Sequence, residues 1–112
     1  MKENTWTQEF PAAITVCDAQ GVILEMNETS CNTFTKYGGA ALIGQNLMAC
    51  HSEASVAKLH EMMQSQQPNV YTIEKEGQKK LIYQCPWYDN KQFAGLVEIS
   101  IPIPDDMPHF KR

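Results

Sequence analysis

The feature that most restricts the fold of this chain is a pair of short apolar runs separated by a tight turn. The runs lie at residues 13–17 and 22–26 and are rich in β-branched and aliphatic residues, which are typical of strands. Between them, Asp18 to Gly21 are turn formers, and Gly21 can adopt the left-handed backbone conformation that a tight turn needs. Residues 13–26 therefore predict a β-hairpin.

Directly after this hairpin the sequence changes to helical spacing. Asn27 is a good N-cap residue, and Cys31 and Phe34 follow at the spacing of one helix face. A helix is expected over residues 27–36, because the pair Gly38-Gly39 would end it. Two single helical turns are expected next, at residues 40–43 and 45–50.

One longer helix is predicted from His51 or Ser52 to about Ser65. Its apolar residues recur at the spacing of a single helix face. They are Val56, Leu59, Met62 and Met63. This is the clearest helical segment of the chain, and its apolar face is expected to cover a sheet.

The sequence after Pro68 is typical of strands. Strands are expected at residues 70–74, 80–88 and 93–101, with turns at Gly77 and at Asp89-Asn90. Pro86 cannot donate to a ladder, so a bulge is expected near Trp87. In the last strand Val97, Ile99 and Ile101 alternate with Leu96, Glu98 and Ser100, and we expect the Val/Ile set to face the core. For the two preceding strands either face fits as the inward one.

Composition excludes several classes of protein. The 112 residues fit one domain, and 43% hydrophobic and 20% charged residues are ordinary globular usage. The net charge is −4, and Lys and Arg are nowhere concentrated beyond the pair Lys79-Lys80, so nucleic-acid binding is disfavoured. No stretch approaches the roughly 18 apolar residues that span a bilayer, and the N-terminus lacks the apolar core of a secretory signal. We therefore expect a cytoplasmic protein without membrane contact.

This order of elements resembles the PAS fold, an α+β fold with a five-stranded antiparallel sheet and helices packed on one face. "ITVCDAQGVILEMN" looks like the opening hairpin of PAS domains, and "FTKYGGAALIGQNL" resembles the segment that follows their first helix. The resemblance covers residues 11–103, preceded by a helical flanking segment at 1–10 and followed by an extended tail at 104–112. Both a stand-alone protein and a piece of a longer one fit these features.

PAS resemblance implies a non-enzymatic sensory module for signal transduction. Such domains enclose a cavity that holds a small molecule, and they report through dimer or partner contacts. No nucleophile elbow or phosphate-binding glycine loop points instead to an enzyme. A homodimer is expected through Trp6, Phe10 and the Leu96 side of the sheet, together with a signalling protein partner. The alternative is an interaction domain with a filled core and no ligand.

No cofactor signature is complete in the sequence, so the cofactor is unknown. Flavin photosensors of the family carry a reactive Cys where this chain has Leu47, so a flavin–Cys adduct is not expected. Haem sensors of the family place a His near the position of Ser55, and only His51, one turn earlier, offers an axial ligand of different geometry. Cys50 beside His51 lacks the further ligands of a metal site, so no metal is expected.

Eight residues are candidates for binding a non-covalent ligand. Apolar walls are expected from Phe34, Leu47, Leu59 and Met63. Polar-tipped aromatic residues at the mouth are Tyr71, Tyr83 and Trp87, each of which could instead fill the core or the outer sheet face. His51 completes the set, either as a ligand-binding residue or as part of the helix cap.

Overall fold

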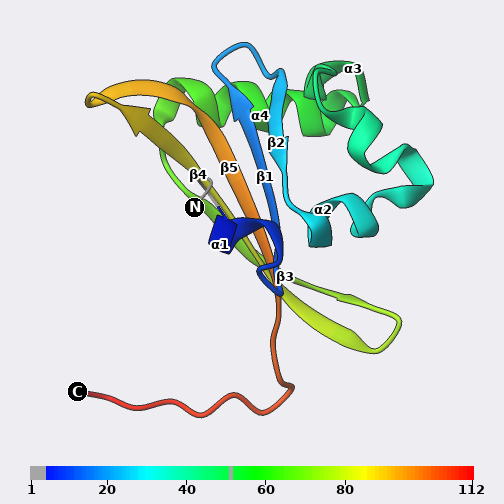
Figure 1. Ribbon diagram of the computed structural model, residues 1–112. Helices are drawn as coiled ribbons and strands as arrows, with labels where there is room; N and C mark the ends of the chain where they lie inside the picture. Colours follow the sequence, from blue (N-terminus) through cyan, green and yellow to red (C-terminus); the bar gives the residue numbers. More distant parts are fainter. Residues whose placement is uncertain (1–4, 51) are drawn as a thin grey trace.

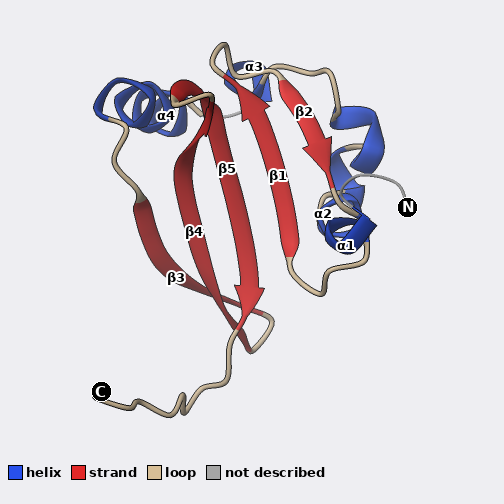
Figure 2. Ribbon diagram, turned by 60° about the vertical axis from the view of Figure 1, so that its left-hand side comes forward, coloured by secondary structure: helices blue, strands red, loops and turns tan. Residues whose placement is uncertain are grey.

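The computed structural model describes residues 5–50 and 52–112, and at residues 49 and 50 the backbone alone. Its centre is a five-stranded antiparallel sheet with the strand order β2-β1-β5-β4-β3 (Figure 2). The strands are β1 (Ala13–Asp18), β2 (Ile23–Met26), β3 (Asn69–Lys75), β4 (Gln78–Asp89) and β5 (Gln92–Pro102). The predicted α+β arrangement and the five strands are thus confirmed.

The segments between β2 and β3 supply the helices that cover one face of the sheet, which we call the inner face (Figure 1). They are α2 (Glu28–Thr33), η1 (Thr35–Tyr37), η2 (Gly39–Leu42), α3 (Leu47–Cys50) and α4 (Glu53–Ser65). The short N-terminal helix α1 (Thr5–Gln8) lies by Ile14 and Val16 on the opposite, outer face. After β5, residues 104–112 run away from the sheet as exposed chain without helix or strand (Figure 1).

Asn27 connects three segments at the start of this helical layer. Its side-chain oxygen accepts hydrogen bonds from the backbone N–H of Ser30 at 2.9 Å, as an N-cap, and of Ile14 at 3.0 Å. Its amide nitrogen donates to the carbonyls of Thr7 at 2.9 Å and Ala12 at 2.8 Å. The predicted cap is confirmed, and all four bonding positions of this buried amide are used.

The first helix is shorter than the predicted 27–36, because α2 ends at Thr33 and a 3₁₀ turn follows. Thr33 and Thr35 bond back to carbonyls of the preceding turn, at 2.8 Å to Thr29 and Asn32. Gly38 then takes the left-handed conformation. The longer helix follows the prediction: Ser52 caps it, and α4 runs to Ser65.

The two hairpins that join the last three strands have two-residue turns. Glu76-Gly77 and Asn90-Lys91 all have positive φ, as type I′ turns require. The second turn lies one residue later than the predicted Asp89-Asn90. The bulge expected near Trp87 is present as a register shift between Trp87 and Tyr88.

The prediction that the Val/Ile set of the last strand faces the core was wrong. Leu96 lies opposite Cys17 of β1 and is 5% exposed, where it packs with Met62 of α4. The inner face of β5 therefore carries Leu96, and with it Glu98 and Ser100. Val97, Ile99 and Ile101 lie on the outer face. The Val/Ile set is more hydrophobic than the set with Leu96, Glu98 and Ser100. The hydrophobic pattern therefore favoured the wrong face of β5 as the inner one.

The apolar surface expected to support a dimer therefore lies on the outer face and not on the Leu96 side of the sheet. Leu96 itself is buried beneath the helical layer, and the exposed apolar part of this inner face is confined to Tyr71 and Ile73 at the β3 edge. The outer face instead carries a continuous set of apolar side chains on three neighbouring strands. They are Ile14, Val16, Val97, Ile99, Ile101, Leu81, Tyr83 and Cys85.

Candidate functional site: a cavity between helices and sheet

A cavity of about 560 Å³ lies between the inner face of the sheet and the helical layer. Its apolar wall is formed by side chains of β1, β2, β5, η1, η2, α3 and α4, together with Phe34 between α2 and η1. The wall residues include Cys17, Ile23, Met26, Phe34, Leu42, Leu47, Leu59, Met62 and Leu96. Such a volume lies within the range of small-molecule sites, and an apolar wall is typical of them.

The structure brings three of the predicted apolar residues together in this wall. Phe34 follows α2, Leu47 begins α3, and Leu59 lies on α4. Met63 packs against the cluster of Cys17 and Leu96 rather than lining the cavity. His51 lies outside the described residues.

The three predicted aromatic residues do not lie together. Tyr71 of β3 lies opposite buried Ile82 and so shares the inner face, although it is 42% exposed and does not line the cavity. Tyr83 lies opposite Ile99, which places it on the outer face, where it is 40% exposed. A mouth formed jointly by the three aromatic residues is therefore absent, because their strand positions place them on two faces.

Trp87 lies opposite Gly95, and its indole Nε1 donates to the carbonyl of Cys17 in β1 at 2.9 Å. β5 separates β4 from β1, so the indole crosses β5 at Gly95 to make this bond. Gly95 has φ +151°, and a Cβ there would collide with the Cys17 carbonyl. Trp87 therefore closes the end of the sheet and does not line the cavity.

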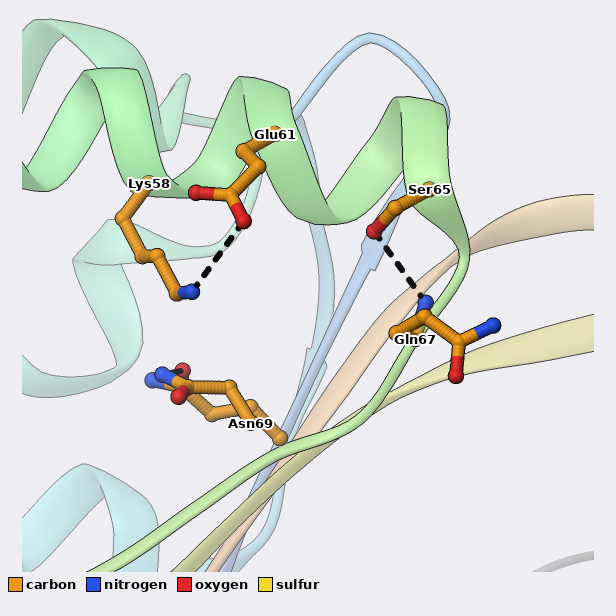
Figure 3. Close-up of polar contacts among 6 residues, drawn as sticks. Lys58, Glu61, Ser65, Gln67 and Asn69 are labelled. Atoms are coloured by element: carbon orange, nitrogen blue, oxygen red, sulfur yellow. Dashed lines mark hydrogen bonds and ion pairs between the residues drawn. The ribbon is translucent and has the colours of Figure 1, made fainter.

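Most polar side chains of the cavity lie on its sheet side, and among the described lining residues the phenol of Tyr37 in η1 is the exception. Thr15, Gln84 and Glu98 line the cavity at neighbouring positions of β1, β4 and β5. Asn69 donates to Gln84 at 2.9 Å, and Gln84 donates to Glu98 at 2.7 Å, so a hydrogen-bonded row crosses three strands. Figure 3 shows Asn69 pointing to the side of the sheet that carries α4. Thr15 shares a 2.6 Å hydrogen bond with Ser30 of α2.

None of the residues of this row was predicted from the sequence as a site residue. Its signature was available, because Gln84 and Glu98 interrupt otherwise apolar strands at positions that share one face. A charged residue at such a position is unusual on a buried sheet face. The assignment of the Val/Ile set to the core hid this signature.

Two titratable groups near the cavity have shifted pKa values. Burial raises the pKa of the Cys17 thiol, and the nearby charge of Asp18 adds to that rise. Burial likewise raises the pKa of Tyr71, with a further contribution from the negative charge of Glu98. Cys17 is therefore held as a neutral thiol, which behaves as a small apolar wall residue.

No group of three or more His, Cys, Asp or Glu residues that could hold a metal is found among the described residues. The two histidines of the described part of the chain, His60 on α4 and His109 in the tail, are both exposed. Neither lines the cavity. Among the described residues, no helix is long and apolar enough to cross a membrane.

The sheet order and the one-sided helical layer define an architecture shared with several solved sensor domains. The Aer2 receptor of Vibrio cholerae, described as a dual PAS-haem oxygen sensor, superposes with a TM-score of 0.66 at 15% identity, over 83% of this chain and 95% of that one. The PAS domain of the histidine kinase ThkA gives a TM-score of 0.65 at 17% identity, over 80% and 97%. VqmA bound to DPO gives 0.66 at 10% identity, over 88% of this chain and 56% of that chain.

No family model and no curated protein sequence matches the chain. At these identities the solved structures establish the fold alone. The chain has the PAS fold, and the resemblance read from its sequence is confirmed at that level.

Proposed function

We propose that this domain is a non-enzymatic sensory module that binds a small molecule non-covalently in the cavity and transmits binding to a second copy or a partner protein. The observation that carries the proposal is the cavity itself, about 560 Å³ lined mostly by apolar side chains, with Thr15, Gln84 and Glu98 together on the sheet side. A domain of this size would otherwise be expected to fill its core with side chains. We further expect it to act in the cytoplasm.

Phe34, Leu47 and Leu59 are the proposed apolar contacts of the ligand, and Thr15, Gln84 and Glu98 are the proposed polar contacts. Met63 supports this wall from behind. Tyr71 stands beside the polar row, while Tyr83 and Trp87 belong to the outer face that we assign to signal output.

The experiment is a screen of soluble small molecules against ¹⁵N-labelled protein by NMR, repeated with Leu59→Trp. Replacing Leu59 by the larger indole fills space in the cavity. We expect hits to shift the amide resonances of residues such as Thr15 and Gln84 in the wild type and not in the variant. Hits that bind the Leu59→Trp protein equally well, or shifts confined to the outer face, would refute the site.

The outer face supports the proposed output. Its apolar set is continuous over β1, β5 and β4, and the Trp6–Phe10 pair beside it is exposed, with ring centroids 5.9 Å apart. Apolar surface of this extent is typical of protein contacts. We expect a homodimer through this face, abolished by Ile99→Lys. A monomer at high micromolar concentration in sedimentation velocity, with and without a bound hit, would refute it.

The same apolar outer face favours the second candidate, an interaction domain that works without a ligand. In that case Leu59→Trp would leave partner or dimer contacts unchanged, and the NMR screen would give no hits. Haem sensing through His51 is the remaining alternative. It predicts a Soret absorbance band on purification or after haem addition that is lost in His51→Ala, and the lack of a band removes it.

A further inference from the structure

We propose that the ligand of this cavity carries one cationic nitrogen, such as a protonated amine or amidine, on an otherwise apolar body, and that Glu98 binds this nitrogen. This inference rests on the proposed function and specifies the chemistry of the ligand. It follows from the charge, the hydrogen bonds and the surroundings of Glu98.

Glu98 is the acidic residue of the cavity wall, half-buried on the inner face of the central region of the sheet. Thr15 lies opposite it on β1 and Gln84 lies opposite it on β4. The wall around these three residues is apolar. A carboxylate in such surroundings loses part of its hydration, so a group that restores a charge partner gains more there than in water.

The hydrogen-bonded row fixes the direction of the donors. Asn69 donates its amide N–H to the Gln84 Oε1, which leaves the Gln84 Nε2 to donate to Glu98 Oε1. The opposite orientation of Gln84 would place its carbonyl oxygen against the carboxylate, so the charge of Glu98 selects the observed one. Gln84 therefore holds one oxygen of Glu98 in a defined position toward the cavity.

The second oxygen, Glu98 Oε2, has no hydrogen-bond partner in the described part of the chain. No fully buried side-chain oxygen among the described residues lacks a partner, so this oxygen is accessible. No Lys, Arg or His of residues 5–50 and 52–112 lines the cavity. Lys58 on α4 pairs with Glu61 at 3.5 Å (Figure 3). Glu98 thus presents an acceptor and a negative charge to the cavity without a cation of the described chain beside it.

The rest of the cavity determines the remainder of the ligand. Phe34, Leu59 and Met62 offer apolar and aromatic contact across from the polar row. A neutral ligand could use Glu98 only through an N–H or O–H donor, and an anion would be repelled by it. A ligand with a cationic nitrogen on an apolar body can pair its charge with Glu98 and pack its body against the apolar wall.

The test uses three probes of the same shape: 4-phenylbutylamine, 4-phenylbutan-1-ol and 4-phenylbutanoate. Their affinities are measured at neutral pH by NMR titration of the wild-type protein, Glu98→Gln and Glu74→Gln. Glu74 is an exposed residue of β3, so its variant removes the same charge away from the cavity. Thermal unfolding and the dispersion of the NMR spectrum establish that each variant is folded.

We expect the wild type to bind the amine about tenfold or more tightly than the alcohol, with the carboxylate weakest. Glu98→Gln should weaken the amine about tenfold while changing the alcohol little, and Glu74→Gln should change neither. Equal affinity for amine and alcohol, or undiminished amine binding by Glu98→Gln, would overturn the inference while leaving the proposed ligand site standing. If no probe binds at millimolar concentration while the screen of soluble molecules gives hits in the cavity, the inference alone fails; if neither gives binding, the proposed function fails with it.

Discussion

Replacing Asn27 by Ala removes the side chain that connects the N-terminal segment, β1 and α2. The side chain makes four hydrogen bonds of 2.8–3.0 Å and is 3% exposed, so water cannot readily replace it. A net contribution of about 0.5–1.5 kcal/mol for each of the four bonds, with the cap included, gives a loss of about 2–6 kcal/mol in the free energy of unfolding. Domains of this size have a total free energy of unfolding of about 5–15 kcal/mol, so the variant should be only marginally stable.

Urea unfolding followed by circular dichroism measures this loss. With a slope of about 1.5–2 kcal/mol per molar urea, the midpoint should fall by about 2 M. Asn32→Ala is the matched control, because Asn32 is an exposed residue of the same helix, and its effect should stay within about 0.5 kcal/mol. A loss below about 1 kcal/mol for Asn27→Ala, or equal losses for both variants, would refute the assigned role of the buried amide.

Three further changes test other parts of the structure. Gly95→Ala places a Cβ against the Cys17 carbonyl, so the free energy of unfolding should fall by more than about 2 kcal/mol in thermal unfolding. Gly44→Ala, at a position with positive φ but open space around it, should lower it by only about 1 kcal/mol. Equal losses for the two variants would contradict this. Because burial raises the Cys17 pKa, iodoacetamide at pH 8 should modify Cys17 more slowly than Cys31, as followed by peptide mass mapping, and equal rates would be the contrary result. Glu98→Gln removes a negative charge that helps to raise the Tyr71 pKa, so the Tyr71 phenol should ionise at lower pH in the variant by NMR titration; an unchanged or higher pKa would contradict that assignment.

Local residue chemistry predicted the order of the elements. Asn27 and Ser52 are side-chain caps, and the glycine at 77 follows the left-handed Glu76 in a two-residue turn, so helix starts and hairpins could be read directly. The end of the first helix was misplaced, because hydroxyl groups of Thr33 and Thr35 bond to the backbone and tighten the last turn.

Tertiary arrangement limited the prediction of the site. Phe34, Leu47 and Leu59 were chosen from helical spacing, and the structure places all three in the cavity wall. Strand residues were harder, because both faces of β4 and β5 carry apolar side chains, and only pairing with β1 decides which face meets the helices. Tyr83 and Trp87 consequently lie on the outer face.

The polar row depends on the same register. Gln84 and Glu98 become neighbours only when β4 and β5 pair with these two residues opposite each other. A single-strand pattern contains no information on that pairing. The polar row, which is the most specific group of the proposed site, could therefore be identified only from the structure.

The central claim is that this PAS-fold domain holds a small molecule in its 560 Å³ cavity. Native mass spectrometry of the protein, purified without denaturation and measured beside Leu59→Trp, tests it most directly. We expect the wild type to carry an additional non-covalent mass that denaturation releases and that the cavity-filled variant lacks. A wild-type native mass equal to that of the chain alone, or the same additional mass on both proteins, would contradict the account.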